Sequence, residues 1–394
     1  MVYIQVTVDE AIPRVASKGC LMLKSHSVLL IMNWYDQTVH RGVAEYARRH
    51  RWALQVIGAH DFHVPQSWGG DGIICLLEDS PELYRLVKRV KVPVVDMAAR
   101  HPELPLTRVL VDGHRMGRLA ATHLLERGFH HFACFRFRNL WQEVGREAGF
   151  VEAVQEAGMT ATVLQWSFPA PGRPDSFKEE IAALQALPKP LGLFIMHDHE
   201  TDQLIRPMLD AGINVPGDIA IVSVNNDELL CDFAPVPVTS VDPDWFTLGW
   251  KAAETLAALM DGGPRPATTL LIPPKGIVTR ASTDIFTVAD ADTASALRYI
   301  HNNSHLNLGV DDVVAYVGIS RSTLQRRFRE FVNSSINEQI ARTRIRRIQE
   351  RLAHPKISGA DIARDLNFES PRRLYAYFRK HTGTSLSDYR DKAL

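Results

Sequence analysis

Two segments near the C-terminus of this 394-residue chain share a spacing of Ser, Leu and Phe that would place Arg and Gln on the outside of a short helix. The repeated residues are Ser320, Leu324 and Phe328 in VGISRSTLQRRF (317–328), and Ser370, Leu374 and Phe378 in LNFESPRRLYAYF (366–378). Side chains four positions apart lie on one helix face, so Leu and Phe point inward and the residues between them point outward. Arg and Gln form paired hydrogen bonds with guanine and adenine, so the outward faces have the chemistry to contact bases.

The outward residues near the start of each of these helices are the candidates for base contacts. They are Arg321, Ser322, Gln325 and Arg326 in the first segment, and Arg372, Arg373 and Ala376 in the second.

A short helix and a tight turn precede the first segment. VDDVVAYV (310–317) has the pattern of an amphipathic helix, and Gly318 can take the positive φ of a sharp turn. Ser320 is a natural N-cap for the helix that follows. This order predicts a helix-turn-helix unit, whose second helix enters the major groove of DNA.

The second segment repeats this order. ADIARDL (360–366) is the first helix, and Asn367, which tolerates positive φ better than most residues, stands where Gly would be expected. Ser370 caps the next helix, and Pro371 occupies its first position, where Pro is favoured. We therefore expect a second helix-turn-helix unit.

A basic stretch, NEQIARTRIRRIQERLAH (337–354), has the pattern of one helix that joins the two units. Its apolar side is formed by Ile340, Ile345, Ile348 and Leu352. Its arginines are Arg342, Arg344, Arg346, Arg347 and Arg351. We expect some of these arginines to contact DNA phosphates, which position a protein without specifying sequence. At least half of them fit a solvated charged face equally well.

Charge is distributed unevenly, although the whole chain has a formal net charge of zero. Residues 294–394 hold 18 Lys and Arg against 10 Asp and Glu, a net charge of +8, and residues 1–293 hold 27 against 35, a net charge of −8. A basic C-terminal region on an acidic body favours a polyanion-binding module joined to another domain. A solvated basic surface is the alternative, and charge alone does not decide between the two.

The last 100 residues resemble the AraC/XylS-type DNA-binding domain. The residues that carry the resemblance are Ser320, Leu324, Arg326, Phe328, the arginine-rich helix, Ile362, Ala363, Phe368, Ser370, Phe378, Arg379, Lys380, Gly383, Tyr389 and Arg390. One departure is Ser385–Leu386, where the family usually has Ser–Pro. The resemblance implies two helix-turn-helix units in successive major grooves. It also implies that Ser322, Gln325 and Arg326, with Arg372, Arg373 and Ala376, are the base-reading residues.

Residues 27–279 alternate short apolar runs with amphipathic stretches, a pattern typical of mostly parallel sheets covered by helices on both faces. With 45% hydrophobic residues the chain can bury a sizeable core. The expected strands lie in 27–33, 52–57, 72–77, 92–97, 131–135, 191–196 and 219–225, and clear helical patterns span 114–128 and 245–263. This extent is enough for two doubly wound sheets that face each other.

The same region is similar to the LacI/GalR effector domain. Asp112, Gly117, Ala120, His123, Leu124, Leu125 and Gly128 carry the likeness, together with 191–198, 212–227 and 277–283. The resemblance implies an α/β, two-lobed, periplasmic-binding-protein-like fold around a sugar-sized cleft, followed here by the all-α domain with two helix-turn-helix units. The expected domains are an N-terminal extension of unknown role (1–26), an effector domain (27–283), a linker (284–293) and the DNA-binding domain (294–394).

Polar residues follow several of the expected strands, where ligands of open α/β sheets bind. The candidates for ligand contacts are Asp36, Arg146, Asp198, Asn225, Asn226 and Asp227, with Trp34, Trp141 or Phe137 to cover an apolar sugar face. A polar residue at the end of a strand is often a helix cap or turn former instead. His123, His197 and His199 are expected to be structural, because no spacing of His, Asp and Glu indicates a metal site.

An effector domain followed by an AraC-type domain is the arrangement of bacterial xylose-operon regulators. The resemblance implies a homodimeric transcriptional regulator that binds promoter half-sites in double-stranded DNA and responds to a sugar, with xylose favoured and RNA polymerase as a possible contact of an activator. Another pentose, a hexose or a purine would suit a similar cleft. Activation, repression or both remain open.

Other classes of protein fit the sequence less well. No GxGxxG, P-loop, GxSxG or metal constellation supports a sugar-acting enzyme, and we expect no cofactor and no metal. No apolar run reaches the length that spans a bilayer, so we expect no membrane contact. The N-terminal residues lack the apolar region of a secretory signal, which argues against a binding protein that delivers sugar to a transporter. Cysteines 20, 75, 134 and 231 stand alone, which fits a cytoplasmic protein.

Overall fold

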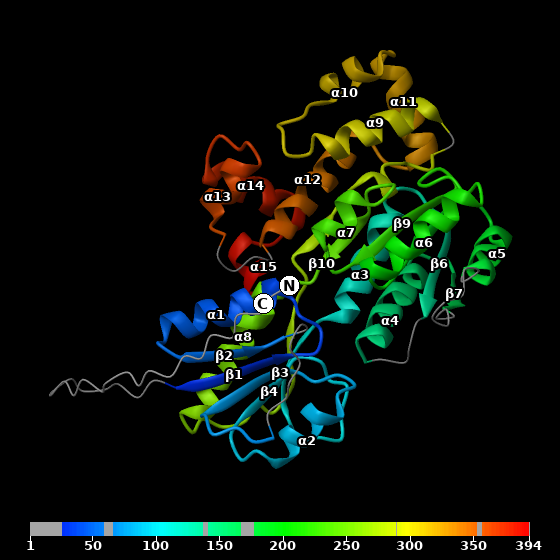
Figure 1. Ribbon diagram of the computed structural model, residues 1–394. Helices are drawn as coiled ribbons and strands as arrows, with labels where there is room; N and C mark the ends of the chain where they lie inside the picture. The colour runs from blue at the N-terminus through cyan, green and yellow to red at the C-terminus, as the bar shows by residue number, and fades with distance from the viewer. Residues whose placement is uncertain are drawn as a thin grey trace, which may run out of the picture.

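The computed structural model of the chain describes residues 26–58, 66–136, 141–166, 177–288, 290–352 and 357–393. Of the expected N-terminal extension only His26 belongs to the described residues. Two α/β lobes and a helical domain make up the described part (Figure 1). The expected fold class is therefore confirmed.

The first lobe is built on a six-stranded parallel sheet with the order β11-β5-β4-β3-β1-β2. Its strands are β1 (Ser27–Met32), β2 (Ala53–Ile57), β3 (Gly72–Leu76), β4 (Val94–Asp96), β5 (Thr107–Val111) and β11 (Leu270–Ile272). Its helices are α1 (Gln37–Arg49), α2 (Pro81–Arg89) and α8 (Trp245–Met260). Helices cover both faces of the sheet, so β3 is apolar and buried throughout, and β1 is apolar and buried from Val28 onward.

The second lobe repeats this plan with the order β12-β10-β9-β8-β6-β7, in which only β12 is antiparallel to its neighbour. Its strands are β6 (His131–Arg136), β7 (Ala161–Gln165), β8 (Leu191–Phe194), β9 (Ile219–Val224), β10 (Thr239–Asp242) and β12 (Gly276–Val278). Its helices are α3 (Gly113–Leu125), α4 (Trp141–Glu156), α5 (Lys178–Ala186), α6 (Asp198–Asp210) and α7 (Glu228–Phe233), with a 3-10 turn η1 (Ala281–Thr283).

The chain crosses between the lobes three times: from β5 to α3, from β10 to α8, and from β11 to β12. Neighbouring crossings are tied together, because Asp112 donates its backbone N–H to Ile272 and Lys275 donates its own to Asp242, at 2.8 and 2.9 Å. Three short connections between two sheets have the geometry of a hinge, and we use this name for them below.

Five strands of the structure were not predicted from the sequence, namely β5, β7, β10, β11 and β12. β11 and β12 have only three residues each, too few to show a strand periodicity. β7 lies at the edge of its sheet, and three of its five residues are exposed, so it lacks an apolar run. β5 and β10 are short, and each directly precedes a polar crossing between the lobes.

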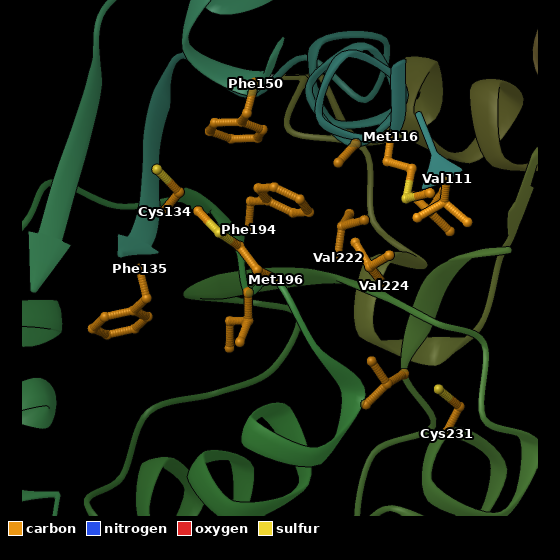
Figure 2. Close-up of a cluster of buried hydrophobic side chains, with 14 of the residues drawn as sticks. Val111, Met116, Cys134, Phe135, Phe150, Phe194, Met196, Val222, Val224 and Cys231 are labelled. Carbon is orange, nitrogen blue, oxygen red and sulfur yellow. The ribbon is translucent and has the colours of Figure 1, made fainter. Parts of the chain in front are cut away.

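The core of the second lobe is formed by side chains of its sheet, α3 and α4 (Figure 2). Phe150 of α4 stacks on Phe194 of β8 with ring centroids 5.0 Å apart. Val111 and Met116, which flank the first crossing, belong to the same buried cluster. The first crossing is therefore packed into a buried cluster that continues into the first lobe through residues such as Val109.

Two helix pairs approach each other closely at glycines. Gly117 of α3 and Gly149 of α4 face the backbone of the opposite helix, where an added Cβ would lie 1.9 Å from the Arg146 oxygen and 2.0 Å from the His114 oxygen. Gly42 and Gly249 play the same part between α1 and α8, with distances of 2.2 Å to the opposite backbone. Only glycine permits this spacing.

The remaining helices form two compact units joined by one long helix. They are α9 (Ala291–Asn302), α10 (Val310–Val317), α11 (Arg321–Val332), α12 (Ile336–Leu352), α13 (Gly359–Asp365), α14 (Pro371–Thr382) and α15 (Leu386–Ala393). Asp290 caps α9, whose first turn includes residues 291–293 of the segment expected as a linker. Figure 1 shows α12 between the α9–α11 group and the α13–α15 group.

Both turns have the predicted form. Gly318 and Asn367 have φ of 78° and 50°. Ser320 accepts a hydrogen bond from the Thr323 N–H at 3.2 Å, and Ser370 accepts one from the Arg373 N–H at 3.3 Å, which caps α11 and α14. The inward residues Leu324, Phe328, Leu374 and Phe378 are completely buried.

Candidate ligand cleft and nucleic-acid interface

In the first lobe, the candidate ligand residues follow β1. Asp36 caps α1, and its Oδ1 accepts the backbone N–H groups of Thr38 and Val39 at 2.7 Å each. Burial raises the pKa of Asp36, and the charge of Asp227 in the other lobe contributes in the same direction. Asp36 therefore faces the second lobe across the hinge. Its second carboxylate oxygen has the chemistry to accept a hydrogen bond from a ligand.

Trp34 precedes this cap and remains 44% exposed. Its ring meets that of Trp245 edge to face, with centroids 5.7 Å apart, and Trp245 in turn donates its indole N–H to the Asn225 carbonyl at 3.2 Å. Trp245 begins α8 directly after the second crossing. The pair thus joins the end of β1 to the end of β9. The place of Trp245 in the cleft could not be predicted from the sequence, because its partner Asn225 lies 20 residues away.

In the second lobe, Arg146 of α4 is only 2% exposed. Its Nη1 donates to the Met196 carbonyl at 2.5 Å and lies 3.1 Å from His197 Nδ1, and its Nη2 lies 3.4 Å from Asn225 Oδ1. Its Nε is buried with no hydrogen-bond partner in the described part of the chain. Burial lowers the pKa of Arg146 to about 10, an effect that the charge of Glu143 opposes.

His197 and Glu143 support this arginine. His197 Nε2 lies 3.4 Å from Glu143 Oε1, while its Nδ1 faces Arg146. The two residues come from α4 and from the end of β8, so the arginine is oriented from two elements. The expectation that His197 is structural agrees with this position, since it holds another side chain in place. Glu143 was not among the predicted site residues, because nothing in its spacing in the sequence distinguishes it.

Asp198, another candidate for a ligand contact, is held by hydrogen bonds within the protein. It is buried, and its two oxygens accept hydrogen bonds from the Ser240 hydroxyl and the Asp227 N–H, at 2.7 and 2.8 Å. Burial raises its pKa, and the hydrogen bonds that it accepts from Ser223 and Ser240 oppose that rise. Asp198 joins the ends of β8, β9 and β10, which leaves little of it for a ligand.

Asn226 and Asp227 are also engaged within the protein. The Asn226 amide oxygen accepts a hydrogen bond from Arg280 at 3.0 Å, and its N–H donates to Ser240 at 3.0 Å. Asp227 caps α7 through the N–H groups of Leu229 and Leu230. Asn225 has a φ of 116°, and this strained turn directs its side chain to Arg146. Among the three, Asn225 is the one whose side chain lies beside the guanidinium of Arg146.

Two further aromatic candidates precede or begin α4. Trp141 begins α4, but its side chain lies outside the described residues, as does the whole of Phe137.

Within the described residues, no group of three or more His, Cys, Asp or Glu side chains is arranged to hold a metal ion. None of the described helices is long and apolar enough to cross a membrane.

The candidate base-reading residues lie on two helix faces. Arg321, Ser322 and Arg326 of α11 are exposed and Gln325 is half-buried, and Arg372, Arg373 and Ala376 of α14 are all exposed. Three of the arginines form exposed ion pairs: Arg321 lies 3.0 Å from Asp311 of α10, Arg326 lies 3.5 Å from Glu330, and Arg373 lies 3.3 Å from Glu369. Exposed pairs of this kind contribute little, so the arginines can exchange them for contacts with DNA.

The arginines of α12 have several different environments. Arg344 is buried; its two terminal nitrogens donate to Asn307 Oδ1 at 2.7 Å and to the Leu366 carbonyl at 2.8 Å. Its guanidinium lies 4.0 Å from the ring centroid of Phe368. Arg344 therefore holds the two units together and is not a phosphate contact, whereas Arg342 is exposed.

Comparisons with known proteins agree with this two-part organisation. Residues 121–283 match the periplasmic binding protein-like domain, and residues 313–392 match a helix-turn-helix domain. The chain is 28% identical over 391 residues to the xylose operon regulatory protein of Escherichia coli strain K12, a match that covers 94% of this chain and 98% of that protein. The protein of the same name from Haemophilus influenzae is 24% identical over 378 residues, 90% and 95% of the two chains.

Solved structures give the same result. The structure of the xylose-binding transcription activator xylR superposes with a TM-score of 0.60 at 26% identity, over 94% of this chain and 99% of that chain. The chain is a helix-turn-helix transcriptional regulator. A LacI family regulator from Enterococcus faecium with bound ribose superposes with a TM-score of 0.52 at 20% identity. The match covers 65% of the present chain and 98% of the Enterococcus chain, and it supports the fold of the two lobes. The resemblances to the LacI/GalR effector domain and to the AraC-type domain are confirmed, and the expectation that the regulator is not an enzyme is confirmed with them.

Proposed function

We propose that this regulator binds a pentose between its two lobes, with D-xylose the preferred candidate, and that binding changes the position of the DNA-binding domain. The observation that carries the proposal is Arg146. A buried guanidinium with an unpartnered Nε is costly unless a ligand supplies an acceptor. The charges of Glu143, Asp198 and Glu200 already act on Arg146 and favour its charged form, so the acceptor that its Nε lacks need not be an anion, and a neutral ligand with several hydroxyl oxygens suits it.

The neighbours of Arg146 complete a set of groups that suits a sugar. Asn225 offers an amide, Asp36 offers a carboxylate from the other lobe, and Trp34 offers an exposed aromatic ring. A pentose hydroxyl both donates and accepts, so it can bind an arginine and a carboxylate at once, while its apolar face packs on a ring. The names of the two xylose operon regulatory proteins and of xylR support xylose in particular.

Closure of the lobes at the hinge would change the position of the DNA-binding domain. The exit from the second lobe is η1, and Thr283 there binds both His123 and Arg127 of the α3 region. Helix α9 follows within eight residues. A ligand that prefers the closed form shifts the equilibrium by its difference in affinity for the two forms, and the DNA-binding domain follows.

Homodimer formation is also proposed. Phe233 and Leu229, one turn apart on α7, are 82% and 75% exposed, and a second copy of the chain would bury them. A dimer would present four helix-turn-helix units to paired promoter half-sites, and we further propose activation through RNA polymerase in the cytoplasm. Sedimentation of the wild type and of Phe233→Asp tests the dimer, which the substitution should weaken.

A thermal-shift panel tests the sugar. A ligand that binds only the folded regulator raises its melting temperature. At a ligand concentration a hundredfold above Kd, the free energy of unfolding increases by about 2.7 kcal/mol. We expect D-xylose to give the largest shift among pentoses, hexoses and purines, and Arg146→Met to abolish it. Arg118→Met, a substitution of a half-buried arginine in the second lobe, is the matched control and should keep the shift. A larger shift with a hexose or a purine would replace xylose and leave the regulator assignment unchanged.

A further inference from the structure

A second cavity lies away from the space between the lobes, where α12 meets the effector domain. Its volume is about 420 Å³, and it is lined by the outer side of α3, by β12 with the crossing before it, and by the second half of α12. This volume is within the usual range of small-molecule sites. The cavity is therefore large enough for a ligand that touches both domains.

The lining is strongly basic. Lys275 comes from the third crossing, and Arg346, Arg347 and Arg351 come from successive turns of α12. Among the described residues of the lining, Asp242 is the only acidic one. Cations that converge from two domains repel one another, and the repulsion is relieved when an anion occupies the space between them.

The existing contacts of these cations leave hydrogen-bond donors available. Lys275 Nζ lies 3.8 Å from Asp242 and 3.7 Å from Asp244, and Arg351 lies 3.7 Å from Asp365. These distances exceed those of direct hydrogen bonds. Arg347 uses Nε to bind the Ser304 hydroxyl at 2.7 Å, which leaves its two terminal nitrogens for a ligand. Arg346 is different, because it pairs with Glu126 of the effector domain.

Two histidines line the inner end of the cavity without adding charge. His123 is hydrogen-bonded to Thr283 at 2.8 Å, and His301 to Arg127 at 2.9 Å. Burial, followed by the charge of Arg127, lowers the pKa of both imidazoles, that of His301 to about 3. The positive charge of the site is therefore that of Lys275 and the arginines alone.

We propose that this cavity is a second effector site, which binds a small phosphate monoester through Lys275 of the effector domain and Arg347 and Arg351 of α12. Guanidinium groups match phosphate oxygens in pairs, and an ammonium group adds a point charge, so this set suits a dianionic phosphate. A neutral sugar would gain little from three cations. The site is independent of the proposed sugar site.

Occupancy would couple the two domains. The ligand would touch the third crossing on one side and α12 on the other, so it would stabilise the docked position of the DNA-binding domain. By linkage, phosphate binding and the docking of α12 on the effector domain strengthen each other by the same factor. An event that separates α12 from the effector domain would therefore weaken phosphate binding. The cell would thereby combine a signal from a neutral sugar with one from a phosphorylated metabolite.

Calorimetric titration of the full-length regulator with inorganic phosphate, at constant ionic strength, tests the proposal. We expect saturable binding of one phosphate per chain, weakened at least tenfold by Lys275→Ala and by Arg351→Ala. Both side chains are partly exposed, and circular dichroism would check that the variants fold. Arg342→Ala, an exposed arginine of the same helix outside the cavity, should bind phosphate as the wild type does. Absence of saturable binding, or equal weakening by Arg342→Ala, would overturn the proposal.

A second arm separates a free phosphate monoester from the phosphates of DNA. The titration is repeated with the regulator bound to its duplex. Binding of phosphate that persists, together with an unchanged DNA affinity in Lys275→Ala, supports a small-molecule site. Competition between phosphate and duplex, with Lys275→Ala weakening both by the same factor, would assign the cations to the DNA backbone and overturn the small-molecule site.

Discussion

Arg127, just after α3, donates through Nη2 to Nε2 of His301 on α9 at 2.9 Å, which links the effector domain to the DNA-binding domain. Arg127 is 1% exposed, and its Nε also donates to the Thr283 carbonyl at 2.8 Å. Its guanidinium lies 5.5 Å from the ring centroid of Phe286. One buried side chain thus contacts the exit from the second lobe, the connecting segment and the first helix of the DNA-binding domain.

Arg127→Met should destabilise the regulator, because it leaves the Thr283 carbonyl and His301 without a donor. Buried polar groups without partners cost about 1–3 kcal/mol each, so we expect a loss of at least about 2 kcal/mol in the free energy of unfolding by urea. Arg118→Met is the control, since the exposed pair of Arg118 with Glu156 is worth at most about 1 kcal/mol. Equal losses in the two variants would contradict the role of Arg127.

Acid should weaken the same junction through His301. Its pKa of about 3 in the folded state lies below the ordinary 6.5, because of burial first and then the charges of Arg127 and Arg347, and His123 lies nearby. The unfolded chain therefore takes up a proton more readily. The contribution to stability is complete above about pH 6.5 and is lost as the pH falls towards 3, by at most about 1.4 kcal/mol per pH unit.

Unfolding by urea between pH 7.5 and pH 5 measures this loss. His301→Gln removes the titrating group and keeps an acceptor for Arg127, so its stability should fall less steeply than that of the wild type. Parallel curves for the two proteins would show that His301 does not titrate as described.

Close packing of α3 on α4 predicts a cost at Gly149. In Gly149→Ala the new methyl group would lie 2.0 Å from a backbone oxygen, which cannot move aside without shifting the helix. We expect a loss of about 1–3 kcal/mol in stability. Gly69→Ala, where nothing lies within 4 Å, should be neutral or stabilising by up to about 1 kcal/mol. A neutral Gly149→Ala would mean that the two helices are farther apart than described.

Arg344 should set the spacing of the two helix-turn-helix units. In Arg344→Met the bonds to Asn307 and Leu366 are lost, so the units are no longer fixed relative to each other. The wild type should gain about a hundredfold in affinity when a duplex carries the sites for both units in place of one. We expect that gain to fall sharply in the variant, as measured by fluorescence anisotropy. An undiminished gain would assign the spacing to other contacts.

Local features were predicted well from the sequence, because their causes are local. Gly318 ends α10 and Ser320 begins α11, and each acts on the residues beside it. Asn367 was recognised as a turn residue for the same reason. Patterns of this kind also gave the central strands of both sheets, each of which is apolar along its length.

Contacts between distant residues were not predictable in the same way. Asp198 has the position of a ligand contact in the sequence, yet its partner Ser240 lies 42 residues away and occupies its carboxylate. Arg127 shows no special pattern, and its partner His301 lies 174 residues away. Arg344 was one of several arginines on a basic helix, and only the fold distinguishes it from Arg342. Such roles depend on how the elements assemble.

The central claim is tested most directly by the affinity of full-length Arg326→Ala for a duplex that the wild type selects from random sequences. Loss of a base-reading arginine should cost about 1–3 kcal/mol, a weakening of roughly ten- to a hundredfold, and D-xylose should still raise the melting temperature of the variant. An anisotropy titration gives the affinity. Unchanged affinity for the selected duplex, or no preference of the wild type for it over random DNA, would contradict the account.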